Sequence, residues 1–463
     1  MEFIGRRREL DMLGRAYTSG RSSLIPIYGR RRIGKSELVR RFMRDRSGIY
    51  LLGKQAPEQH QIEEFLHLAS TVLREPLLGR LSVSGWKEAL EIVLQKWTSD
   101  VPLVIALDEF QWLAESSPEL PSVLQELWDV QWQNSNRVML LLCGSHIGFM
   151  EREVLGRKSP LFGRRTAQIL LRPFGHVEAA RFQRDYSLVD QARTWFICGG
   201  VALYHRYFTS EQSVEMNIRA CLLEEFAPLF READFLLREE LREVENYHAV
   251  LMALASGSAT APDISARSGI PASSLPYYLN QLIELGYVAR RHPLTGRPPA
   301  TRHVRFAVSD PLLRFWFRFV FPNISFVLQM GDERAFTERV APQLDAFYGE
   351  GFERLCRQAL PALYQQEGVS AAFEVGEFWS PDVQIDIVGV RDDNWTDLGE
   401  CRFGKVRSAR AVADELDAKV QKYPNPRNAT IGKRLFTRES VPEPRRSPGV
   451  RYHCLDDLYG DGS

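Results

Sequence analysis

The residues with the clearest chemical meaning lie near the amino end, where two glycines enclose a loop that ends in lysine and serine. The loop reads Gly29-Arg30-Arg31-Arg32-Ile33-Gly34-Lys35-Ser36. Its glycines let the main chain fold around a phosphate group, so that successive N–H groups face the anion. Lys35 would reach the β- and γ-phosphates of a nucleoside triphosphate, and the Ser36 hydroxyl would hold Mg²⁺. The pattern therefore predicts that residues 29–36 bind ATP and Mg²⁺.

Two carboxylates follow a later apolar run and fit the metal side of the same chemistry. The run at 102–107 is followed directly by Asp108 and Glu109. This is the Walker B pattern, in which Asp108 completes the Mg²⁺ shell through water and Glu109 polarises the water that attacks the γ-phosphate. A strand that ends in a solvated acidic turn is the alternative, and the preceding glycine loop makes it the weaker one.

Two further polar residues are candidates for assisting hydrolysis. Ser145 follows the apolar run at 138–143 and could sit as a sensor between Asp108 and the γ-phosphate. A plain junction between strand and loop would explain Ser145 as well. Arg164 precedes a later apolar run, and near the nucleotide it would offset charge that develops on the transferred phosphoryl group. A surface salt bridge is the alternative for Arg164.

The segments that must position these residues alternate between short apolar runs and amphipathic stretches. Apolar runs lie at 24–28, 49–52, 102–107, 138–143 and 167–171, with helical patterns near 58–74, 86–98 and 120–132. Alternating strands and helices predict an α/β domain whose parallel sheet is covered on both faces. The glycine loop then falls between a strand and a helix, as phosphate binding requires.

Together these motifs resemble the archaeal-type AAA+/STAND family of P-loop ATPases, over about the first 210 residues. The opening segment, Phe3-Ile4-Gly5-Arg6-Arg7-Arg8-Glu9-Leu10, is similar to the start of these proteins. The resemblance implies an ATP-binding α/β domain with strand order 5-1-4-3-2, and it implies that Arg6 lies near the nucleotide. One departure is in the helical lid, where the family usually carries Gly-x-Pro. Ala202 stands at that proline position, so nucleotide sensing by the lid is an open question.

Residues 261–308 have the order helix, turn, helix and hairpin. A helical stretch at 263–268 ends at Gly269, a second covers 271–286, and the hairpin tip lies at 289–297. This order is similar to a winged helix-turn-helix, whose second helix enters the DNA major groove while the wing contacts phosphate. The positive charge lies in the wing, at Arg290, Arg291, Arg297, Arg302 and Arg305. Phosphate contact is thus better supported than base readout, and use as a protein-binding or intramolecular brake is the alternative.

The last region carries acidic residues on predicted neighbouring strands. Strands are expected at 371–378, 383–390 and 396–403, after a helix at 345–365. Asp386 and Glu400 would meet if two strands pair, Arg402 would share a face with Glu400, and Glu353 comes from the helix. Two carboxylates and a cation on adjacent strands can bind Mg²⁺ and cut phosphodiesters. The pattern resembles the PD-(D/E)XK nuclease fold, specifically the C-terminal domain of unknown function that accompanies archaeal-type ATPases.

This second resemblance fails at one position. The nuclease family usually has a lysine two residues after the glutamate, and here that residue is Arg402. Arginine can stabilise phosphate charge, but it stays protonated and cannot act as a tunable amine. Lys405 would replace it only if a bulge intervened. The fold is therefore better supported than cleavage, and a hairpin with solvated acids is the alternative.

Length and composition limit what the rest of the chain can be. A chain of 463 residues is too long for one core. We expect an ATPase core at 1–174, a helical lid at 175–245, a winged helix-turn-helix with a bridging helix at 246–325, and a restriction-endonuclease-like α/β domain at 340–463. A formal net charge of zero gives no global attraction to nucleic acid or membrane. Six scattered cysteines without a C-x-x-C pair indicate a reducing, cytoplasmic location, and no membrane span is expected.

Three functions are compatible with these observations. The favoured one is an ATP-hydrolysing molecular switch that changes how the winged helix and the tail engage DNA or a partner protein. The second is an ATP-regulated, Mg²⁺-dependent DNA nuclease, and the third is a nucleotide-bound regulator that does not hydrolyse ATP. Glu109 favours hydrolysis, Arg402 disfavours cutting, and the balanced charge disfavours strong non-specific DNA binding. Self-association is a further open possibility.

Overall fold

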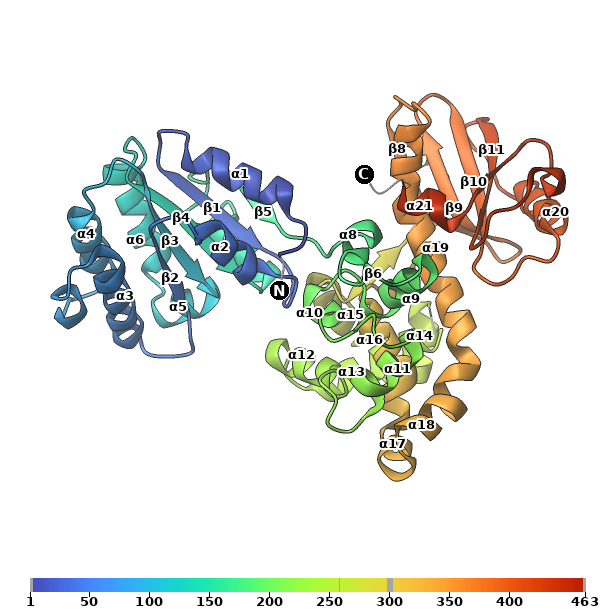
Figure 1. The fold of residues 1–463 in the computed structure, drawn as a ribbon, viewed down its shortest axis with the longest axis horizontal. Coiled ribbons are helices and arrows are strands. Elements are labelled where there is room, and N and C mark those ends of the chain that lie inside the picture. The colour runs from blue at the N-terminus through green and yellow to red at the C-terminus, as the bar shows by residue number, and fades with distance from the viewer. Residues whose placement is uncertain (1–2, 258, 298–302, 461–463) are drawn as a thin grey trace. The chain divides into compact units, whose positions relative to one another are not determined.

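The computed structural model describes residues 3–257, 259–297 and 303–460. Its ribbon divides into two compact units, residues 1–173 and residues 174–463 (Figure 1). The first unit holds the residues expected to form the ATPase core, apart from residue 174. The second holds those expected to form the lid, the winged helix and the tail.

A sheet of five parallel strands forms the centre of the first unit, in the order β2-β3-β4-β1-β5 (Figure 1). The strands are β1 (Ser23–Tyr28), β2 (Gly48–Leu52), β3 (Leu103–Asp108), β4 (Val138–Gly144) and β5 (Ile169–Leu170). Every residue of β1, β3 and β4 is buried, because helices cover both faces of the sheet. This order confirms the predicted one. It also brings the carboxyl ends of β1, β3 and β4 to one edge, where the glycine loop and the acidic pair begin.

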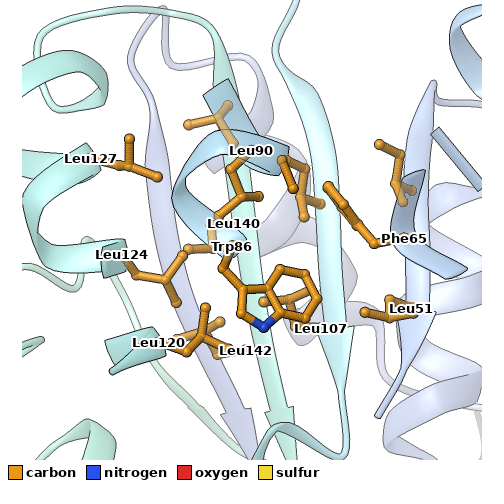
Figure 2. Close-up of a cluster of buried hydrophobic side chains, with 14 of the residues drawn as sticks. Leu51, Phe65, Trp86, Leu90, Leu107, Leu120, Leu124, Leu127, Leu140 and Leu142 are labelled. Carbon is orange, nitrogen blue, oxygen red and sulfur yellow. The ribbon is translucent and has the colours of Figure 1, made fainter. Parts of the chain in front are cut away.

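Helices cover this sheet, and those between residues 58 and 127 pack against it through one continuous apolar cluster. The helices are α1 (Arg7–Tyr17), α2 (Lys35–Met43), α3 (Glu58–Leu73), α4 (Trp86–Lys96), α5 (Phe110–Ser116), α6 (Leu120–Leu127) and α7 (Ile147–Phe149). Trp86 of α4 is 2% exposed and lies against Leu107, Leu140 and Leu142 of the strands (Figure 2). Its indole N–H donates to Ser117 Oγ at 3.1 Å, so burial leaves no polar atom of this ring unsatisfied.

The second unit begins with short helices and continues into the helix-turn-helix. Its first helices are α8 (His176–Ala180), α9 (Leu188–Cys198), α10 (Ala202–His205), α11 (Val214–Ile218) and α12 (Glu232–Glu240). The helix-turn-helix and its wing follow as α13 (Val244–Ala255), α14 (Ala261–Ser268), α15 (Leu275–Glu284), β6 (Val288–Arg291) and β7 (Arg305–Val308). β6 and β7 are antiparallel and form the wing.

A helical connection, buried in its first part, joins the wing to the last domain. It consists of α16 (Pro311–Phe315), the π-helical turn η6 (Trp316–Val320), α17 (Ile324–Met330), α18 (Asp332–Ala335), the π-helical turn η8 (Phe336–Val340) and the long α19 (Ala341–Gln366). Phe315, Trp316 and Phe319 are each at most 1% exposed, so this apolar stretch is part of the core. Within the described ranges, no helix has both the length and the apolar character needed to cross a membrane.

The last domain contains a mixed sheet in the order β12-β11-β10-β9-β8. Its elements are β8 (Phe373–Trp379), β9 (Gln384–Arg391), β10 (Trp395–Arg402), α20 (Ala409–Val420), β11 (Thr430–Thr437), β12 (Val450–His453) and α21 (Leu455–Tyr459). β8, β9 and β10 pair antiparallel, whereas β10, β11 and β12 pair parallel. The sequence predicted the first three strands, but not the two parallel ones.

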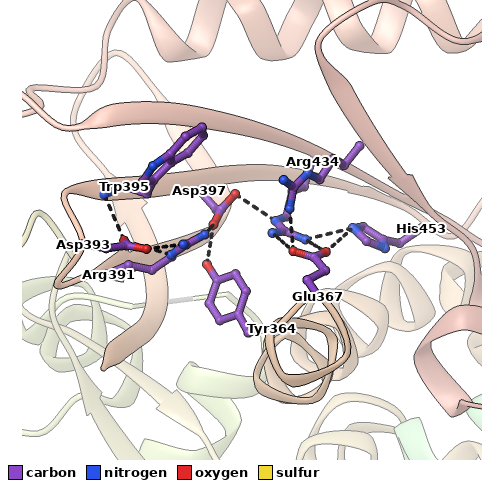
Figure 3. Close-up of polar contacts among 9 residues, drawn as sticks. Tyr364, Glu367, Arg391, Asp393, Trp395, Asp397, Arg434 and His453 are labelled. Carbon is purple, nitrogen blue, oxygen red and sulfur yellow. Dashed lines mark hydrogen bonds and ion pairs between the residues drawn. The ribbon is translucent and has the colours of Figure 1, made fainter. Parts of the chain in front are cut away.

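A buried ion network ties α19 to this sheet (Figure 3). Arg434 is 0% exposed and donates to Asp397 at 2.9 Å and to Glu367 at 2.7 Å. Asp397 also accepts the Tyr364 hydroxyl at 2.7 Å. Burial and then the charge of Arg434 lower the pKa of the adjacent His453 to about 4, so this imidazole is neutral at physiological pH. Two carboxylates thus compensate one fully buried guanidinium, and removing a single partner would cost about 3–5 kcal/mol.

Candidate functional site

The glycine loop connects β1 to α2, and its shape depends on glycine. Gly29 and Gly34 have φ of 147° and 96°, in the region that L side chains avoid. A Cβ at Gly29 would lie 2.3 Å from the carbonyl oxygen of Leu171. The Lys35 ammonium donates to the carbonyl oxygens of Gly29 and Arg30, both at 2.8 Å. The Lys35 ammonium therefore lies at this loop together with the first main-chain N–H groups of α2. Both carry positive charge or partial charge, so the loop is suited to binding an anion.

Hydroxyl groups hold Asp108 at the end of β3. This residue is 0% exposed, and its Oδ2 accepts hydrogen bonds from Ser36 Oγ at 2.6 Å and from the Tyr50 hydroxyl. Tyr50 comes from β2, the neighbour of β3 in the sheet. Burial lowers the pKa of Lys35, while the charges of Glu109 and Asp108 oppose that shift. The carboxylate predicted to complete the Mg²⁺ shell is thus bonded to neutral donors and lies near one cation.

Glu109 is held by two polar side chains. Its Oε2 accepts Ser145 Oγ at 2.7 Å and the Gln111 amide, and that amide also donates to Ser145 Oγ at 3.2 Å. Glu109 has φ of 50° and ψ of 47°, a left-handed conformation that is uncommon for a residue with a side chain. Such backbone strain concentrates at functional sites. Ser145 was predicted between Asp108 and the γ-phosphate, and its hydroxyl donates to the neighbouring Glu109.

Arg6 contacts the glycine loop directly. It is 6% exposed, and its guanidinium donates to the carbonyl oxygen of Ile33 at 3.3 Å. Arg6 also lies 3.5 Å from Glu9 of α1. The residue that caps the first helix thus contributes a cation beside residues 29–36.

The expectation that Arg164 lies near the nucleotide is corrected. Its guanidinium donates to both carboxylate oxygens of Asp129, at 2.8 and 2.6 Å. Two residues later, Thr166 accepts the N–H of Leu24 at 3.1 Å, at the start of β1. The glycine loop follows the other end of β1, so Arg164 lies at the opposite edge of the sheet. The salt bridge named as the alternative is what this residue forms.

The donors at this edge fit a magnesium-bound nucleoside triphosphate by their chemistry. A hydroxyl and a carboxylate are oxygen ligands of the kind that Mg²⁺ prefers. The loop can take this shape only with glycine at position 29, because a Cβ there would collide with the Leu171 carbonyl oxygen. Two residues here were missed by sequence reasoning, Tyr50 and Gln111. Gln111 could have been noticed, since it follows Glu109 by two positions, whereas Tyr50 depends on the register of two strands.

A second group of carboxylates lies where β9 and β10 pair. Asp386 Oδ2 accepts the Cys401 N–H at 3.0 Å, beside Glu400. Asp386 and Glu400 are 6% and 1% exposed. Lys419 of α20 donates to both carboxylate oxygens of Glu400, at 2.8 and 2.7 Å. Sequence reasoning missed Lys419, because a separation of nineteen residues across a loop gives no local pattern.

Arg402 binds the same glutamate, as its position on the strand predicts. Its Nη1 donates to Glu400 and to the Cys401 carbonyl oxygen at 3.0 Å, and its Nη2 donates to Glu415 at 2.7 Å. Burial lowers the pKa of Arg402 and of Lys419, but Glu400 and Glu415 raise both by more, so both stay charged. Two side-chain cations therefore already neutralise Glu400. The described residues also contain no group of three or more His, Cys, Asp and Glu side chains able to hold a metal ion.

Glu353 approaches this cluster from α19. Burial and then the charge of Asp386 raise the pKa of Glu353 to about 8. Burial and then Glu400 raise the pKa of Asp386 to about 6. Arg357 lies 3.7 Å from Glu353 and donates to the carbonyl oxygen of Asp386 at 2.6 Å. The four predicted residues do gather here, and burial favours the protonated form of Glu353.

The wing of the helix-turn-helix is docked on this last domain. Leu294 at its tip is 8% exposed, and its N–H donates to the Glu377 carbonyl oxygen at 2.8 Å. Arg291 pairs with the Glu377 carboxylate at 2.8 Å, and Arg297 donates to a carbonyl oxygen in the loop 424–428 at 3.3 Å. The tip is thus held by apolar, main-chain and ionic contacts at once.

The contacts of the other wing arginines lie on the last domain or within the wing. Arg305 lies over the Trp379 ring of β8 at 4.8 Å, and Arg290 lies over Phe306 within the wing at 5.7 Å. Arg302 lies outside the described residues. Arg291, Arg297 and Arg305, which were expected to meet DNA phosphate, therefore contact the last domain in this structure.

Three segments match known families. Residues 3–201 match an ATPase domain predominantly from Archaea, residues 244–292 match the IclR helix-turn-helix domain, and residues 316–413 match a family described as Archaea bacterial proteins of unknown function. The chain therefore carries an archaeal-type ATPase domain followed by a helix-turn-helix. This confirms the archaeal-type ATPase part of the resemblance, while the STAND assignment and the nuclease likeness of the tail stay predictions.

Relatives in sequence and in fold agree with this assignment. The uncharacterized protein MJECL04 of Methanocaldococcus jannaschii is 27% identical over 454 residues, covering 95% of this chain and 97% of that protein. The uncharacterized ATP-binding protein MJ0423 of the same organism is 39% identical over 44 residues, covering 10% of this chain and 75% of that protein. Among solved structures, the Walker-type ATPase paby2304 of Pyrococcus abyssi has a TM-score of 0.51 at 18% identity, covering 68% of this chain and 96% of that chain. This last likeness shows the fold.

Proposed function

We propose that this chain is an ATP-binding and ATP-hydrolysing molecular switch, whose nucleotide state controls how its second unit engages DNA or a partner protein. One observation supports hydrolysis above all others, namely the adjacent carboxylates of Asp108 and Glu109 at the glycine loop. Asp108 is bonded to Ser36 of the loop at 2.6 Å, and Glu109 is held separately by Ser145 at 2.7 Å. Asp108 is therefore placed to complete a metal shell. Glu109 is placed to orient and deprotonate water.

The residues divide the chemistry between them. Lys35, Arg6 and the amides of residues 29–36 would bind the triphosphate, and Ser36 with Asp108 would hold Mg²⁺. Bound Mg²⁺ neutralises charge on the β- and γ-phosphates. Glu109 would accept a proton from the attacking water, while Ser145 and Gln111 keep its carboxylate in place. Holding these groups rigidly means that little reorganisation is needed when charge develops.

Calorimetry with Mg²⁺ and ATP tests the binding step. We expect association with the unaltered chain and a loss of affinity of at least about a hundredfold in Lys35→Ala, because a buried ammonium–phosphate contact is removed. Lys96→Ala, at an exposed position of α4, is the matched control and should bind normally. Absence of any association with the folded, unaltered chain would overturn the proposal.

Engagement of DNA is supported by the helix-turn-helix match and by the positive charge of the wing. The docked wing supports control by an intramolecular brake, which nucleotide would relieve. Duplex binding followed by fluorescence anisotropy should change between ATP and ADP, and Leu294→Asp should raise affinity by undocking the wing. If the affinity for duplex DNA is the same with ATP and with ADP, DNA is not the partner that the switch controls. A protein partner would then be the alternative.

One observation favours the nuclease alternative, because Lys419 brings an amine to Glu400 where Arg402 cannot act as one. Against it, both oxygens of Glu400 are occupied by side-chain cations. We therefore infer engagement without cutting. DNA cleavage that requires Mg²⁺ and disappears in Asp386→Ala would establish the nuclease instead. If the chain binds ATP normally but does not hydrolyse it, the function is that of a nucleotide-bound regulator without ATPase activity.

A further inference from the structure

An arginine-rich cavity of about 680 Å³ lies inside the second unit. It is bounded by the end of α13, α14, the wing, the helices that follow the wing, α19 and the first strands of the last domain. Among the described residues, eight arginines and four glutamates line it. The walls thus carry a formal excess of four positive charges, although the whole chain has zero net charge. Small-molecule sites usually measure about 300–1,000 Å³, so this cavity has the size of a ligand site.

The deepest arginines are not fully compensated by the protein. Arg314 is 5% exposed, and its Nε–H has no acceptor among the described residues. Arg354 donates to the carbonyl oxygens of Val308 and Ser309 rather than to a carboxylate. Burial and then the charges of Arg314 and its arginine neighbours lower the pKa of Arg354 well below its usual value. Guanidinium groups held close together repel each other, and an anionic ligand would relieve this repulsion.

The glutamates of the cavity neutralise only part of this charge. Glu350 is shared by Arg314 at 3.0 Å and Arg318 at 2.9 Å. Glu377 is the partner of Arg291 at 2.8 Å. Glu353, with its pKa raised to about 8, contributes little negative charge at neutral pH. Positive charge therefore dominates the walls.

We propose that this cavity binds a ligand that carries two or more phosphate groups. Guanidinium groups are planar forks that bind phosphate oxygens in pairs, and several elements present them to one cavity that is open to solvent. The ligand is a free, nucleotide-sized polyphosphate or the phosphorylated end of a nucleic acid strand, which share this chemistry. The site is independent of the glycine loop. The wing supplies Arg291 and Arg305 to its wall, so a bound ligand would contact the wing in its docked position.

The experiment uses the full chain with Lys35→Ala, so that the nucleotide site of the first unit is silent. The probe is a short single-stranded oligonucleotide with a 5′-phosphate and a 3′-fluorophore, followed by fluorescence anisotropy at several salt concentrations. The test variant adds Arg267→Gln, Arg318→Gln and Arg339→Gln, three cavity residues outside the main-chain contacts of Arg354 and Arg357. We expect a loss of affinity of at least about tenfold, and a salt slope that falls by about 0.7 for each phosphate contact removed.

A matched control makes the same change in charge elsewhere in the unit. Arg206→Gln, Arg410→Gln and Arg445→Gln lie at exposed positions outside the cavity and should leave affinity unchanged. Replacing the three cavity arginines by lysine should keep the salt slope while weakening the binding. If the triple glutamine variant does not fold, Arg267→Gln alone, at an exposed position of α14, should still lower the slope.

Competition identifies the source of the phosphates. Displacement of the probe by inorganic tripolyphosphate indicates a free polyphosphate, and displacement only by phosphorylated strands indicates a strand end. The proposal is overturned if the Lys35→Ala chain binds neither probe nor tripolyphosphate, or if the control variant weakens binding as much as the cavity variant. ATP turnover by the unaltered chain is measured separately, so failure here leaves the proposed switch standing.

Discussion

The two carboxylate centres of this chain are built from similar acids but are held by different donors. In the first unit, Asp108 and Glu109 accept hydrogen bonds from hydroxyl and amide groups. In the last domain, Glu400 is bound by the ammonium of Lys419 and the guanidinium of Arg402. The first centre keeps its negative charge for a ligand, and the second has already neutralised it internally.

This difference teaches that a pair of buried acids does not by itself make a metal site. A hydroxyl such as Ser36 can turn a lone pair toward a metal ion, so the ion and the protein do not compete. At Glu400, a metal ion would have to displace two cations from a side chain that is 1% exposed. Breaking such buried pairs is costly, and the second centre therefore resembles the structural network around Arg434 more than a catalytic one (Figure 3).

The largest effect should follow from changing the base of the first centre. Glu109→Gln keeps the shape and the Ser145 contact but cannot accept a proton. ATP turnover should fall by about 10²- to 10⁴-fold, while calorimetry should show nearly unchanged ATP affinity. Glu115→Gln, at an exposed position of the same helix, is the control. Unchanged turnover in Glu109→Gln would assign water activation to another residue.

The matching change in the second centre should act on stability rather than on turnover. Glu400→Gln leaves Lys419 and Arg402 without their shared partner, although Glu415 remains near both, at 3.3 and 2.7 Å. We expect the free energy of local opening around β10 to fall by about 2–3 kcal/mol, measured by hydrogen exchange.

Two observations control this result. Glu439→Gln removes an exposed partner of Arg438 and should change protection by less than about 1 kcal/mol. Millimolar Mg²⁺ should not alter protection of β10 in the unaltered chain. A marked increase with Mg²⁺ would show that the ion does displace the internal cations, and the contrast between the centres would disappear.

How far the sequence predicted each centre depends on where its residues lie along the chain. Ser36, Asp108 and Glu109 belong to local motifs, so their positions followed from the order of strands and loops. Arg164 was misplaced for a simple reason: it precedes β5, and residues before parallel strands lie at the edge opposite the ligand site. The position of Lys419 beside Glu400 could not be predicted from the sequence, because Lys419 lies on a helix that a loop brings back over β10.

The wing shows a second limit of sequence reasoning. Its arginines predicted contact with DNA phosphate, but nothing in their spacing shows which surface they face. Leu294 was the available signal, since an apolar residue at the tip of a solvent-exposed hairpin is unusual. Its burial at 8% exposure against the last domain explains that residue and turns Arg291 inward.

A smaller effect should come from Tyr50, which holds Asp108 from the neighbouring strand. Burial and then Asp108 raise the pKa of this phenol, so it remains a donor at all physiological pH values. Tyr50→Phe removes that donor and loosens the carboxylate, so the Mg²⁺ concentration for half-maximal turnover should rise about tenfold. Tyr17→Phe in α1 is the control. An unchanged Mg²⁺ requirement would mean that Ser36 alone orients Asp108.

The smallest effect should come from Ser145, because Gln111 shares its task. Ser145→Ala removes one neutral hydrogen bond to Glu109, for which the loss is about 0.5–1.5 kcal/mol, or about two- to tenfold in turnover. The loss should appear in kcat and leave KM nearly constant, since Glu109 acts on water and not on the bound nucleotide. Ser122→Ala, at an exposed position of α6, should change neither. If Ser145 instead contacts the γ-phosphate, as its position after β4 first indicated, KM would rise as well, and this split decides between the two roles.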